Sequence, residues 1–363
     1  MKKRLKLIVM ENCKELGEKV NKYLSEQTGE NHIINITNSR FTNGEGKITL
    51  NETVRGSEVY ILSDVFNHSI SYELHGNPHY MGPDEHFQDI KRVISAVGGL
   101  ASKVVVITPF LYGARQHRKK GRESLDCAMS LQELERLGVD SIITFDAHDP
   151  NVANAIPMTP FENLYATHTI LESIIENDKQ EIDNMLVISP DFGAMSRAGY
   201  YADMVGSDVG VFYKRRDLSK VVKGVNPIVA HAYMGAEIEG KNIIIVDDMI
   251  ATGGSMLEVC EEIRKKNPKS INIVSTFAMF TAGIEIFNEA YKKGFFDKVY
   301  ATNLTYVKEE IKSCPWYISV DCSKQLSTII NTMFSNESMA HLFNGKKETV
   351  NMIIKAKKAA SKK

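Results

Sequence analysis

Two adjacent acids followed by a glycine-rich turn are the residues of this sequence best suited to chemistry. Asp247 and Asp248 come directly after 242–246, a mostly β-branched run that predicts a fully buried strand. Four small residues follow shortly afterwards: Thr252, Gly253, Gly254 and Ser255. A glycine-rich loop between a strand and a helix lets backbone N–H groups close around an anion, and the helix dipole strengthens the attraction. Acids beside such a phosphate site predict a ligand that carries both a phosphate and hydroxyl groups, such as a sugar phosphate.

A helix is predicted to follow this turn. Ser255 is a suitable N-cap for it, and the apolar residues beyond it fall at helical spacing: Met256, Val259, Cys260 and Ile263. One alternative is an ordinary strand-to-helix turn with acids at the strand end. Another is the magnesium-binding strand of an NTPase, which requires a GxxxxGK[ST] loop that the sequence lacks.

Composition and charge limit the classes of function. A chain of 363 residues is long for one domain and comfortable for two. The formal net charge of −1 argues against a general nucleic-acid surface, so no nucleic-acid partner is expected. No stretch approaches the roughly 18 apolar residues that span a bilayer, which predicts no membrane partner. The five scattered cysteines lack CxxC spacing and predict reduced thiols in a cytoplasmic protein.

Short apolar strands alternate with helical patterns, which predicts an α/β fold of parallel sheets flanked by helices. Strands are predicted at 6–10, 58–65, 103–110, 141–148, 185–193, 208–216, 242–248, 271–280, 298–304 and 316–321. They form two series joined near 155–165, which indicates two similar halves. The polar segment 67–88 is predicted to be a long loop or insertion with solvated histidines. The lysine-rich run KAKKAASKK, 355–363, is predicted to be a frayed, solvated tail.

The run VDDMIATGGS, 246–255, resembles the phosphoribosyl-diphosphate (PRPP) loop of type I phosphoribosyltransferases and of ribose-phosphate pyrophosphokinases. The resemblance implies two similar domains of type I phosphoribosyltransferase-like fold, each a mainly parallel sheet flanked by helices. We therefore expect an N-terminal domain at 1–160, a C-terminal domain at 161–345 and a basic tail at 346–363. It also implies a set of residues that bind ribose 5-phosphate: Asp247, Asp248, Thr252, Gly253, Gly254 and Ser255.

The N-terminal half favours the pyrophosphokinases, because a phosphoribosyltransferase usually needs only one such domain. Residues 40–45 resemble the F-x-(D/N)-G-E segment of that family, a loop that meets the adenine of ATP bound to a neighbouring subunit. By this resemblance Phe41, Asn43 and Glu45 bind ATP. An aromatic ring offers stacking, while the amide and the carboxylate offer groups that can hydrogen-bond to the adenine edge.

Two further N-terminal segments resemble the same family. Residues 108–124 are similar to its P-Y-x-x-Y-A-R-Q-D-R-K run, which implies ATP contacts from Arg115, Gln116 and His117. Arginine's planar fork suits polyphosphate oxygens. The tripeptide 146–148 matches the family's D-L-H, which implies that His148 helps to hold the Mg²⁺–ATP complex.

The C-terminal half adds two matches. Residues 189–198 resemble the P-D-x-G-x-x-x-R-A motif, which implies that Asp191 belongs to the ribose and metal region. Residues 213–216 resemble the K-R-R that begins the flexible catalytic loop, so Lys214 and Arg216 are the expected catalytic residues. That loop is expected to run from Lys214 to about Gly235 and to close over bound ATP.

The resemblance covers roughly residues 5 to 343 and implies the reaction ATP + ribose 5-phosphate → AMP + PRPP. It also implies Mg²⁺ as the cofactor and a homo-oligomer with its active site at a subunit interface. His117, Ala251 and Phe277 depart from the family, which often has aspartate, aspartate and histidine at these places. His117 and Phe277 keep open a second class, a non-catalytic regulatory paralogue. A third, a phosphoribosyltransferase with an added domain, leaves the N-terminal segments unexplained.

Overall fold

The computed structural model describes residues 4–178, 184–216, 228–343 and 346–360, and at 214–216, 228–231, 341, 343, 359 and 360 it describes the backbone alone. The chain divides into two compact units. Unit 1 contains the described residues of Met1–Ala166, Asn303–Tyr306 and Asp321–Phe343. Unit 2 contains those of Thr167–Thr302, Val307–Val320 and Asn344–Lys363. The C-terminal part of the chain therefore contributes to both units, whereas the predicted boundary at 160/161 separates consecutive segments.

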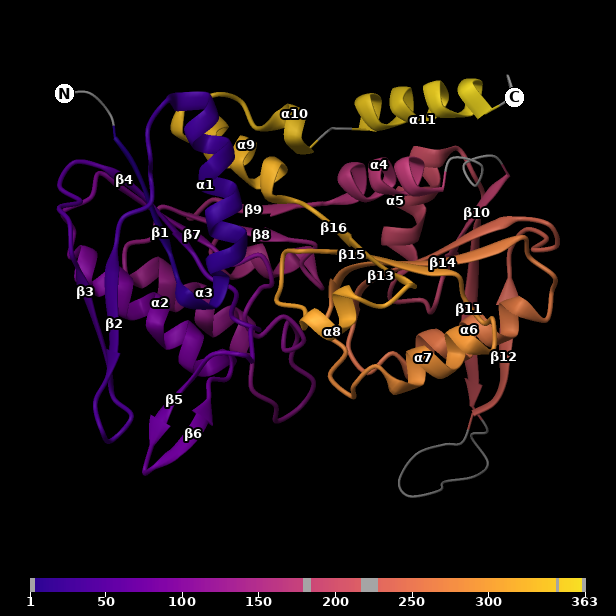
Figure 1. The fold of residues 1–363 in the computed structure, drawn as a ribbon, viewed down its shortest axis with the longest axis horizontal. Helices are drawn as coiled ribbons and strands as arrows, with labels where there is room; N and C mark the ends of the chain where they lie inside the picture. Colours follow the sequence, from indigo (N-terminus) through magenta and orange to yellow (C-terminus); the bar gives the residue numbers. More distant parts are fainter. Residues whose placement is uncertain (1–3, 179–183, 217–227, 344–345, 361–363) are drawn as a thin grey trace. The chain divides into compact units, whose positions relative to one another are not determined.

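Unit 1 is built on a five-stranded parallel sheet in the order β1-β4-β7-β8-β9 (Figure 1). Its strands are β1 (Leu5–Val9), β4 (Glu58–Leu62), β7 (Lys103–Ile107), β8 (Ser141–Phe145) and β9 (Phe161–Leu164). Two antiparallel hairpins accompany it, β2 (Ile36–Arg40) with β3 (Gly46–Leu50) and β5 (Ser71–Leu74) with β6 (Asn77–Tyr80). Its helices are α1 (Lys14–Thr28), α2 (Pro83–Val97), α3 (Asp126–Arg136), α9 (Ser323–Phe334) and α10 (Ala340–Phe343), with 3₁₀ turns at Glu11–Cys13 and Pro150–Ala155.

The inner strands of unit 1 form because their sequences suit burial on both faces. Every residue of β4 and of β8 is buried, as parallel strands covered by helices require. α1 buries the predicted stripe of Leu16, Val20 and Leu24 and packs against α9, which comes from the far end of the chain.

Asp64, which follows β4, is buried in unit 1 and accepts hydrogen bonds from the Phe66 N–H at 2.9 Å and from the segment Asn303–Tyr306. Its carboxylate accepts the Thr305 hydroxyl at 3.1 Å and the Tyr306 N–H at 2.7 Å. Burial raises the pKa of Asp64 to about 6, and these hydrogen bonds oppose the rise. The segment 303–306 is therefore an integral part of unit 1.

Unit 2 is built on a seven-stranded sheet in the order β12-β11-β10-β13-β14-β15-β16, and only the β11–β12 pair is antiparallel. Its strands are β10 (Met185–Ser189), β11 (Val209–Arg216), β12 (Ile228–Met234), β13 (Asn242–Ile250), β14 (Ser270–Ala278), β15 (Lys298–Thr302) and β16 (Tyr317–Val320). Its helices are α4 (Thr167–Asn177), α5 (Met195–Val205), α6 (Gly254–Arg264), α7 (Glu285–Lys292), α8 (Glu309–Lys312) and α11 (Lys346–Ala360).

The strand order of unit 2 reverses between β10 and β13. The chain leaves β10 toward β11 and β12, then returns to the other side of β10 as β13. Such a reversal is a topological switch point, and parallel α/β sheets bind ligands there, at the carboxyl ends of the strands. The sheet topology therefore singles out the residues that follow β10 and β13.

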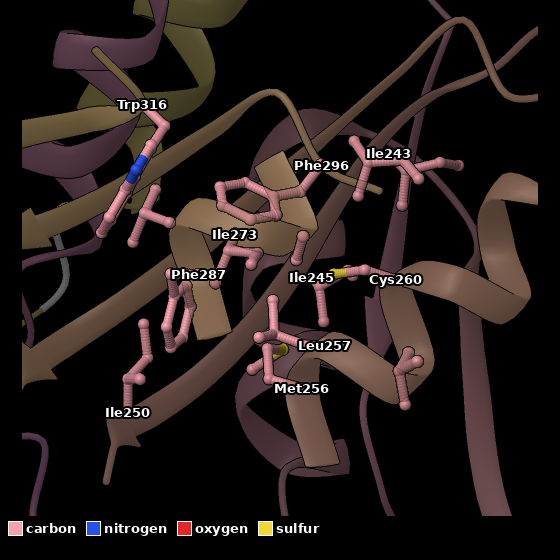
Figure 2. Close-up of a cluster of buried hydrophobic side chains, with 14 of the residues drawn as sticks. Ile243, Ile245, Ile250, Met256, Leu257, Cys260, Ile273, Phe287, Phe296 and Trp316 are labelled. Carbon is pink, nitrogen blue, oxygen red and sulfur yellow. The ribbon is translucent and has the colours of Figure 1, made fainter. Parts of the chain in front are cut away.

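Different helices cover the two faces of this sheet, with α4 and α5 on one and α6 and α7 on the other (Figure 1). Successive strand residues point to opposite faces, so Ile243 and Ile245 join the core under α6 and α7 while Ile244 points the other way. Figure 2 shows this core, in which the rings of Phe287 and Trp316 stack with centroids 5.6 Å apart. The sheet is thus buried on both faces, as the apolar run 242–246 predicted.

The segment 67–88 is not the long loop that the sequence predicted. It forms the β5–β6 hairpin and then enters α2, which begins with Pro83 after Gly82, a favourable place for proline. The prediction of solvated histidines is also wrong for His86, which is buried and whose Nε2 lies 2.7 Å from the Asn67 carbonyl oxygen.

The prediction of a frayed, solvated tail at 355–363 is wrong for 355–360, because these residues form the end of α11. Thr349 and Ile353 are buried one helical turn apart against unit 2. The His168 ring meets the Thr349 hydroxyl at 2.8 Å, and Lys357 donates to the Val205 carbonyl oxygen at 2.7 Å. The many lysines of this segment conceal its short apolar stripe in the sequence.

Two expectations about the whole chain can be compared with the described residues. No helix among them is long and apolar enough to cross a membrane. The five cysteines are free thiols, as predicted, and four of them are buried.

Candidate active site

The strand that carries the two acids is longer than predicted. β13 runs through Asp247 and Asp248 to Ile250, because Met249 and Ile250 continue the parallel pairing with β14. The acids therefore lie inside a hydrogen-bonded strand near its carboxyl end. Their backbone is fixed by the sheet and not by a loop.

Asp247 and Asp248 differ in exposure. The Asp247 side chain is 27% exposed, whereas Asp248 is buried with 3% of its surface exposed. The Asp248 N–H donates to Asp247 Oδ1 at 2.9 Å, and the Met249 N–H donates to Asp248 Oδ1 at 2.8 Å. Asp247 therefore offers a ligand the more accessible carboxylate of the pair.

Burial, followed by the neighbouring charge of Asp248, raises the pKa of Asp247 well above its ordinary value. The guanidinium of Arg197 opposes the rise, with Nη1 3.9 Å from Asp247 Oδ1. A ligand that donates hydrogen bonds to Asp247 would stabilise its charged form. Sugar hydroxyls are such donors.

Arg197 is a residue of this site that the sequence interpretation left without a role. Its side chain is 13% exposed and belongs to the first turn of α5, which follows β10. The signal was present in the run 189–198, where Arg197 stands six residues after Asp191. The position of α5 beside β13 brings it to Asp247.

Asp191 follows β10, on the other side of the switch point. Its Oδ1 accepts the N–H groups of Gly193 at 2.7 Å and Ala194 at 3.1 Å. The Ser189 hydroxyl donates to its carbonyl oxygen at 2.6 Å. The residue is exposed, and within the described part of the chain Oδ2 accepts no hydrogen bond. One carboxylate oxygen thus fixes the turn, and the other is available for a cation.

Gly253, and not Ser255 as predicted, is the N-cap of α6. Its φ is 83°, a left-handed conformation that favours glycine. A Cβ at this position would lie 2.2 Å from Cε2 of the buried Phe287, one of the rings in Figure 2. Gly253 therefore allows both the turn and its close packing on the core. Ser255 lies in the first turn of the helix.

The rest of the loop is open. Apart from its chain neighbours and the backbone of its own helix, no described atom lies within 4 Å of the position where a Cβ on Gly254 would stand, and Thr252 and Ser255 are exposed. The loop precedes a helix of eleven residues, so backbone N–H groups and the positive end of the helix dipole meet here. Residues 252–255 thus have the features of a phosphate site.

The segment after β14 is hydrogen-bonded to the residues that precede this loop. The Met279 N–H donates to the Ile250 carbonyl oxygen, and the Thr281 N–H donates to that of Ala251, both at 2.9 Å. Phe277, which stands where the family often has histidine, is buried. Ala251 and Phe277, which differ from the family, therefore belong to the packed segments that hold the loop 252–255 in place.

Lys214 and Arg216 belong to β11 by their backbone, and Lys214 pairs with His231 of β12. Their side chains lie outside the described residues, so the predicted catalytic role stays a prediction. The predicted loop from Lys214 to Gly235 is too long, because β11 and β12 form an antiparallel pair at its two ends.

In unit 1, residues 41–45 form the tip of the β2–β3 hairpin. Phe41 N–H donates to the Glu45 carbonyl oxygen at 2.8 Å, and Asn43 Nδ2 donates to Glu45 Oε2 at 3.0 Å. Phe41 is 54% exposed. The tip therefore presents an aromatic ring and an amide–carboxylate pair from one tight turn.

The other predicted ATP residues of unit 1 follow β7 and β8. Arg115 and Gln116 are exposed after a turn in which Gly113 has a φ of 69°. The ring of His117 lies edge-on to that of His148, with centroids 5.1 Å apart, and His148 is exposed. The structure therefore brings His117 and His148 together, although they come from different loops.

The two sheets and the residues at the switch point define a class, that of proteins with two phosphoribosyltransferase-type domains. The protein-family model for the N-terminal domain of ribose phosphate pyrophosphokinase matches residues 5–138. The family model for the phosphoribosyl transferase domain matches residues 161–300. The chain belongs to the ribose-phosphate pyrophosphokinase family. The predicted family and fold class are thereby confirmed.

Relatives span nearly the whole chain. The ribose-phosphate pyrophosphokinase of Vibrio parahaemolyticus is 25% identical over 344 residues, which cover 94% of this chain and 99% of the relative. That of Wolinella succinogenes is 27% identical over 331 residues and covers 91% and 96%. The crystal structure of phosphoribosylpyrophosphate synthetase from Mycobacterium smegmatis matches with a TM-score of 0.76 at 24% identity, over 92% of this chain and 99% of the other. This last likeness supports the fold.

Proposed function

We propose that this protein transfers the β,γ-diphosphoryl group of ATP to the C1 hydroxyl of ribose 5-phosphate, giving PRPP and AMP. The observation that carries the proposal is the placement of Asp247 beside the open loop 252–255 at the switch point of unit 2. The N-terminal domain of pyrophosphokinase type distinguishes the reaction from that of a simple phosphoribosyltransferase.

Ribose 5-phosphate is proposed to bind at the end of β13. Asp247 and Asp248 accept hydrogen bonds from the ribose hydroxyls, and hydrogen bonds to charged groups are the stronger ones. The backbone N–H groups of 252–255 and the Thr252 and Ser255 hydroxyls hold the 5-phosphate. This arrangement fixes the sugar and presents its C1 hydroxyl to ATP.

ATP is proposed to bind residues of unit 1. Phe41 stacks on adenine, Asn43 and Glu45 meet its edge, and three residues contact the polyphosphate: Arg115, Gln116 and His117. The exposed ring on a hairpin tip suits contact with a ligand held by another copy of the chain. We therefore propose a homo-oligomer with shared active sites. We also propose that the protein is located in the cytoplasm, where reduced cysteines are the rule.

Mg²⁺ fits the donor groups that the chain offers. This ion keeps several waters and takes one or two carboxylates plus phosphate oxygens, so it needs no protein cage. Within the described residues no group of three His, Cys, Asp or Glu side chains could form one. Asp191 is proposed as a carboxylate ligand, and His148 as a contact made directly or through water. When bound, the ion neutralises charge on the polyphosphate.

The C1 hydroxyl of the sugar attacks the β-phosphorus of ATP, the bond from that phosphorus to the α-phosphate oxygen breaks, and AMP leaves. Lys214 and Arg216 are proposed to stabilise the charge that spreads over the transferring group. Phosphoryl-type transfer depends mainly on such positioning and electrostatics.

The test is to incubate the purified protein with Mg²⁺, ATP and ribose 5-phosphate and to follow AMP and PRPP by chromatography. Equal amounts of both products, absent without the sugar phosphate, are expected. If ATP binds but no AMP forms, the chain is a regulatory paralogue. His117, which takes the place of an aspartate in the ATP segment, is the observation that favours that alternative.

Lys214→Ala tests the catalytic assignment. Loss of one transition-state cation is expected to lower kcat by on the order of 10²–10³ with little change in either KM. Lys269→Ala is the control, since Lys269 is exposed and precedes β14 at the opposite end of the sheet. Equal losses in turnover and in affinity would contradict the assignment.

A further inference from the structure

The β5–β6 hairpin is formed by the insertion that the sequence left without a function. It extends beyond the sheet of unit 1 on the same side as the β2–β3 hairpin, whose tip is 41–45 (Figure 1). In β5, Tyr72 and Leu74 are half-buried while the residues that alternate with them are exposed. One face of the hairpin therefore packs against a neighbouring element.

Glu85, in the first turn of α2, fixes this hairpin to the body of unit 1. Its carboxylate accepts the Tyr72 hydroxyl at 2.9 Å, the His79 Nε2 at 3.0 Å and the Gly82 N–H at 3.2 Å. Burial opposes ionisation, but the hydrogen bonds from Tyr72 and His79 lower the pKa of Glu85. Tyr72 and His79 are cross-strand partners, so one carboxylate holds both strands.

The same Tyr72 contacts the last residue of β2. The Arg40 guanidinium lies 5.3 Å from the centre of the Tyr72 ring, a cation–π geometry. Arg40 also makes a bidentate pair with the buried Asp89 of α2, at 2.9 and 2.5 Å. Arg40, directly before the loop 41–45, is thus held between the hairpin and α2.

The loop itself rests on the hairpin. Gly44 has a φ of 90°, and a Cβ at Gly44 would lie 3.3 Å from Leu74 Cδ1 and 3.4 Å from the Tyr72 hydroxyl oxygen. The loop backbone therefore reaches the two half-buried residues of β5. Tyr72 contacts the helix anchor and the end of β2, and its hydroxyl lies beside the loop tip at Gly44.

We propose that the β5–β6 hairpin holds the loop 41–45 in its ATP-binding conformation, with Tyr72 as the positioning residue. The proposal rests on the proposed function in one respect, the role of that loop in binding adenine. A loop ordered before the ligand arrives loses less conformational entropy on binding, so the hairpin raises affinity for ATP without touching it.

Tyr72→Ala removes the contacts with Glu85 and Arg40 and the hydroxyl beside Gly44, and hydrogen exchange measures the result without any substrate. The amides of Phe41, Gly44 and Glu45 are hydrogen-bonded within the loop. Their exchange is expected to accelerate about tenfold, which corresponds to the loss of one hydrogen bond to a charged group at the low end of its range. Tyr80→Ala is the matched control, because Tyr80 lies on the same hairpin and is 65% exposed.

Steady-state kinetics test the second part of the proposal, that the ordered loop raises affinity for ATP. For Tyr72→Ala, KM for ATP is expected to rise about tenfold, while kcat and KM for ribose 5-phosphate stay unchanged. Tyr72→Phe keeps the ring over Arg40 and loses only the hydroxyl, so it should recover part of the affinity. This conservative variant also keeps the proposal testable if Tyr72→Ala fails to fold.

Unchanged exchange at 41–45 in both Tyr72 variants would overturn the proposal. So would a Tyr72→Ala enzyme with normal KM for ATP when Phe41→Ala raises it, and the proposed function would then still stand. If exchange accelerates but neither Tyr72→Ala nor Phe41→Ala alters KM for ATP, the ATP role of the loop is wrong and the proposal fails with it.

Discussion

The two units place their ligand-facing residues by different means. In unit 2 the strand order reverses between β10 and β13; Asp191 follows β10, and Asp247 lies near the carboxyl end of β13. Among the described strands of unit 1 the sheet order follows the chain without reversal. Its expected ATP residues lie on a hairpin tip and on loops. A site built into a sheet shares its residues with the core, so a substitution there changes both ligand binding and folding stability. A substitution at a hairpin site can abolish ligand binding and leave folding stability unchanged.

The strongest test of this difference is Gly253→Ala in the loop of unit 2. A left-handed alanine costs roughly 1–2 kcal/mol, and crowding of Phe287 adds about 1–3 kcal/mol. We expect the free energy of unfolding to fall by about 2–5 kcal/mol, measured by urea denaturation. Gly254→Ala, whose methyl group meets open space, is the control. A stable Gly253→Ala protein would show that the loop is not part of the core.

Asp247→Asn should separate affinity from stability. KM for ribose 5-phosphate is expected to rise about 10- to 100-fold, because a hydrogen bond to a charged group contributes roughly 1.5–3 kcal/mol. The same change should stabilise the free protein at neutral pH, since it removes the repulsion from Asp248.

The pH dependence of stability gives the sign of this second effect. The raised pKa means that the folded protein binds the Asp247 proton more tightly than the unfolded chain does. The contribution of Asp247 is therefore present below the unfolded pKa of about 3.9 and is lost as pH rises through the folded pKa. As pH rises from the unfolded to the folded pKa of Asp247, the free energy of unfolding measured in urea should fall less in Asp247→Asn than in the unmodified protein. Identical pH profiles would show that Asp247 does not couple stability to pH.

In unit 1, Phe41→Ala should change binding alone. Loss of one base-stacking ring is expected to raise KM for ATP about tenfold, within the 1–3 kcal/mol typical of such contacts. Stability should stay within about 0.5 kcal/mol, as for most surface substitutions. Phe41→Tyr keeps the ring and should retain affinity. A destabilised Phe41→Ala protein would contradict the contrast between the units.

Gly44→Ala sharpens the contrast with the smallest expected effect. Gly44 has a left-handed φ like Gly253, but it faces the movable ends of Leu74 and Tyr72 and not a buried ring. Only the cost of the left-handed backbone remains, so the free energy of unfolding should fall by about 1–2 kcal/mol. Urea denaturation of both glycine variants under identical conditions measures the difference that their surroundings make.

The sequence was sufficient for the elements that depend on local pattern. The strands buried on both faces, the stripe of α1 and the run 242–246 are all set by hydrophobic periodicity. The order of short motifs was enough to identify the family. Residues 252–255 were singled out because their turn requires particular residue types, and residues 41–45 because they resemble a segment of the family.

Features that depend on tertiary pairing were missed. β13 continues past Asp248 because β14 is there to pair with it, and Gly253 displaces Ser255 as N-cap because Phe287 packs beneath it. Arg197 reaches Asp247 only through the packing of α5 beside β13. The β5–β6 hairpin was hidden because its alternation is short and most of its residues are polar.

The interleaving of the two units has a consequence for how the protein is made on the ribosome. Unit 1 needs α9, and its buried Asp64 needs Thr305 and Tyr306. Both come from the last part of the chain, after most of unit 2 has been translated. The N-terminal half therefore cannot complete its folding until nearly the whole polypeptide has emerged from the ribosome. A fragment that ends at residue 160 is therefore expected to expose the α1 surface that α9 covers and to leave Asp64 without its hydrogen bonds from Thr305 and Tyr306.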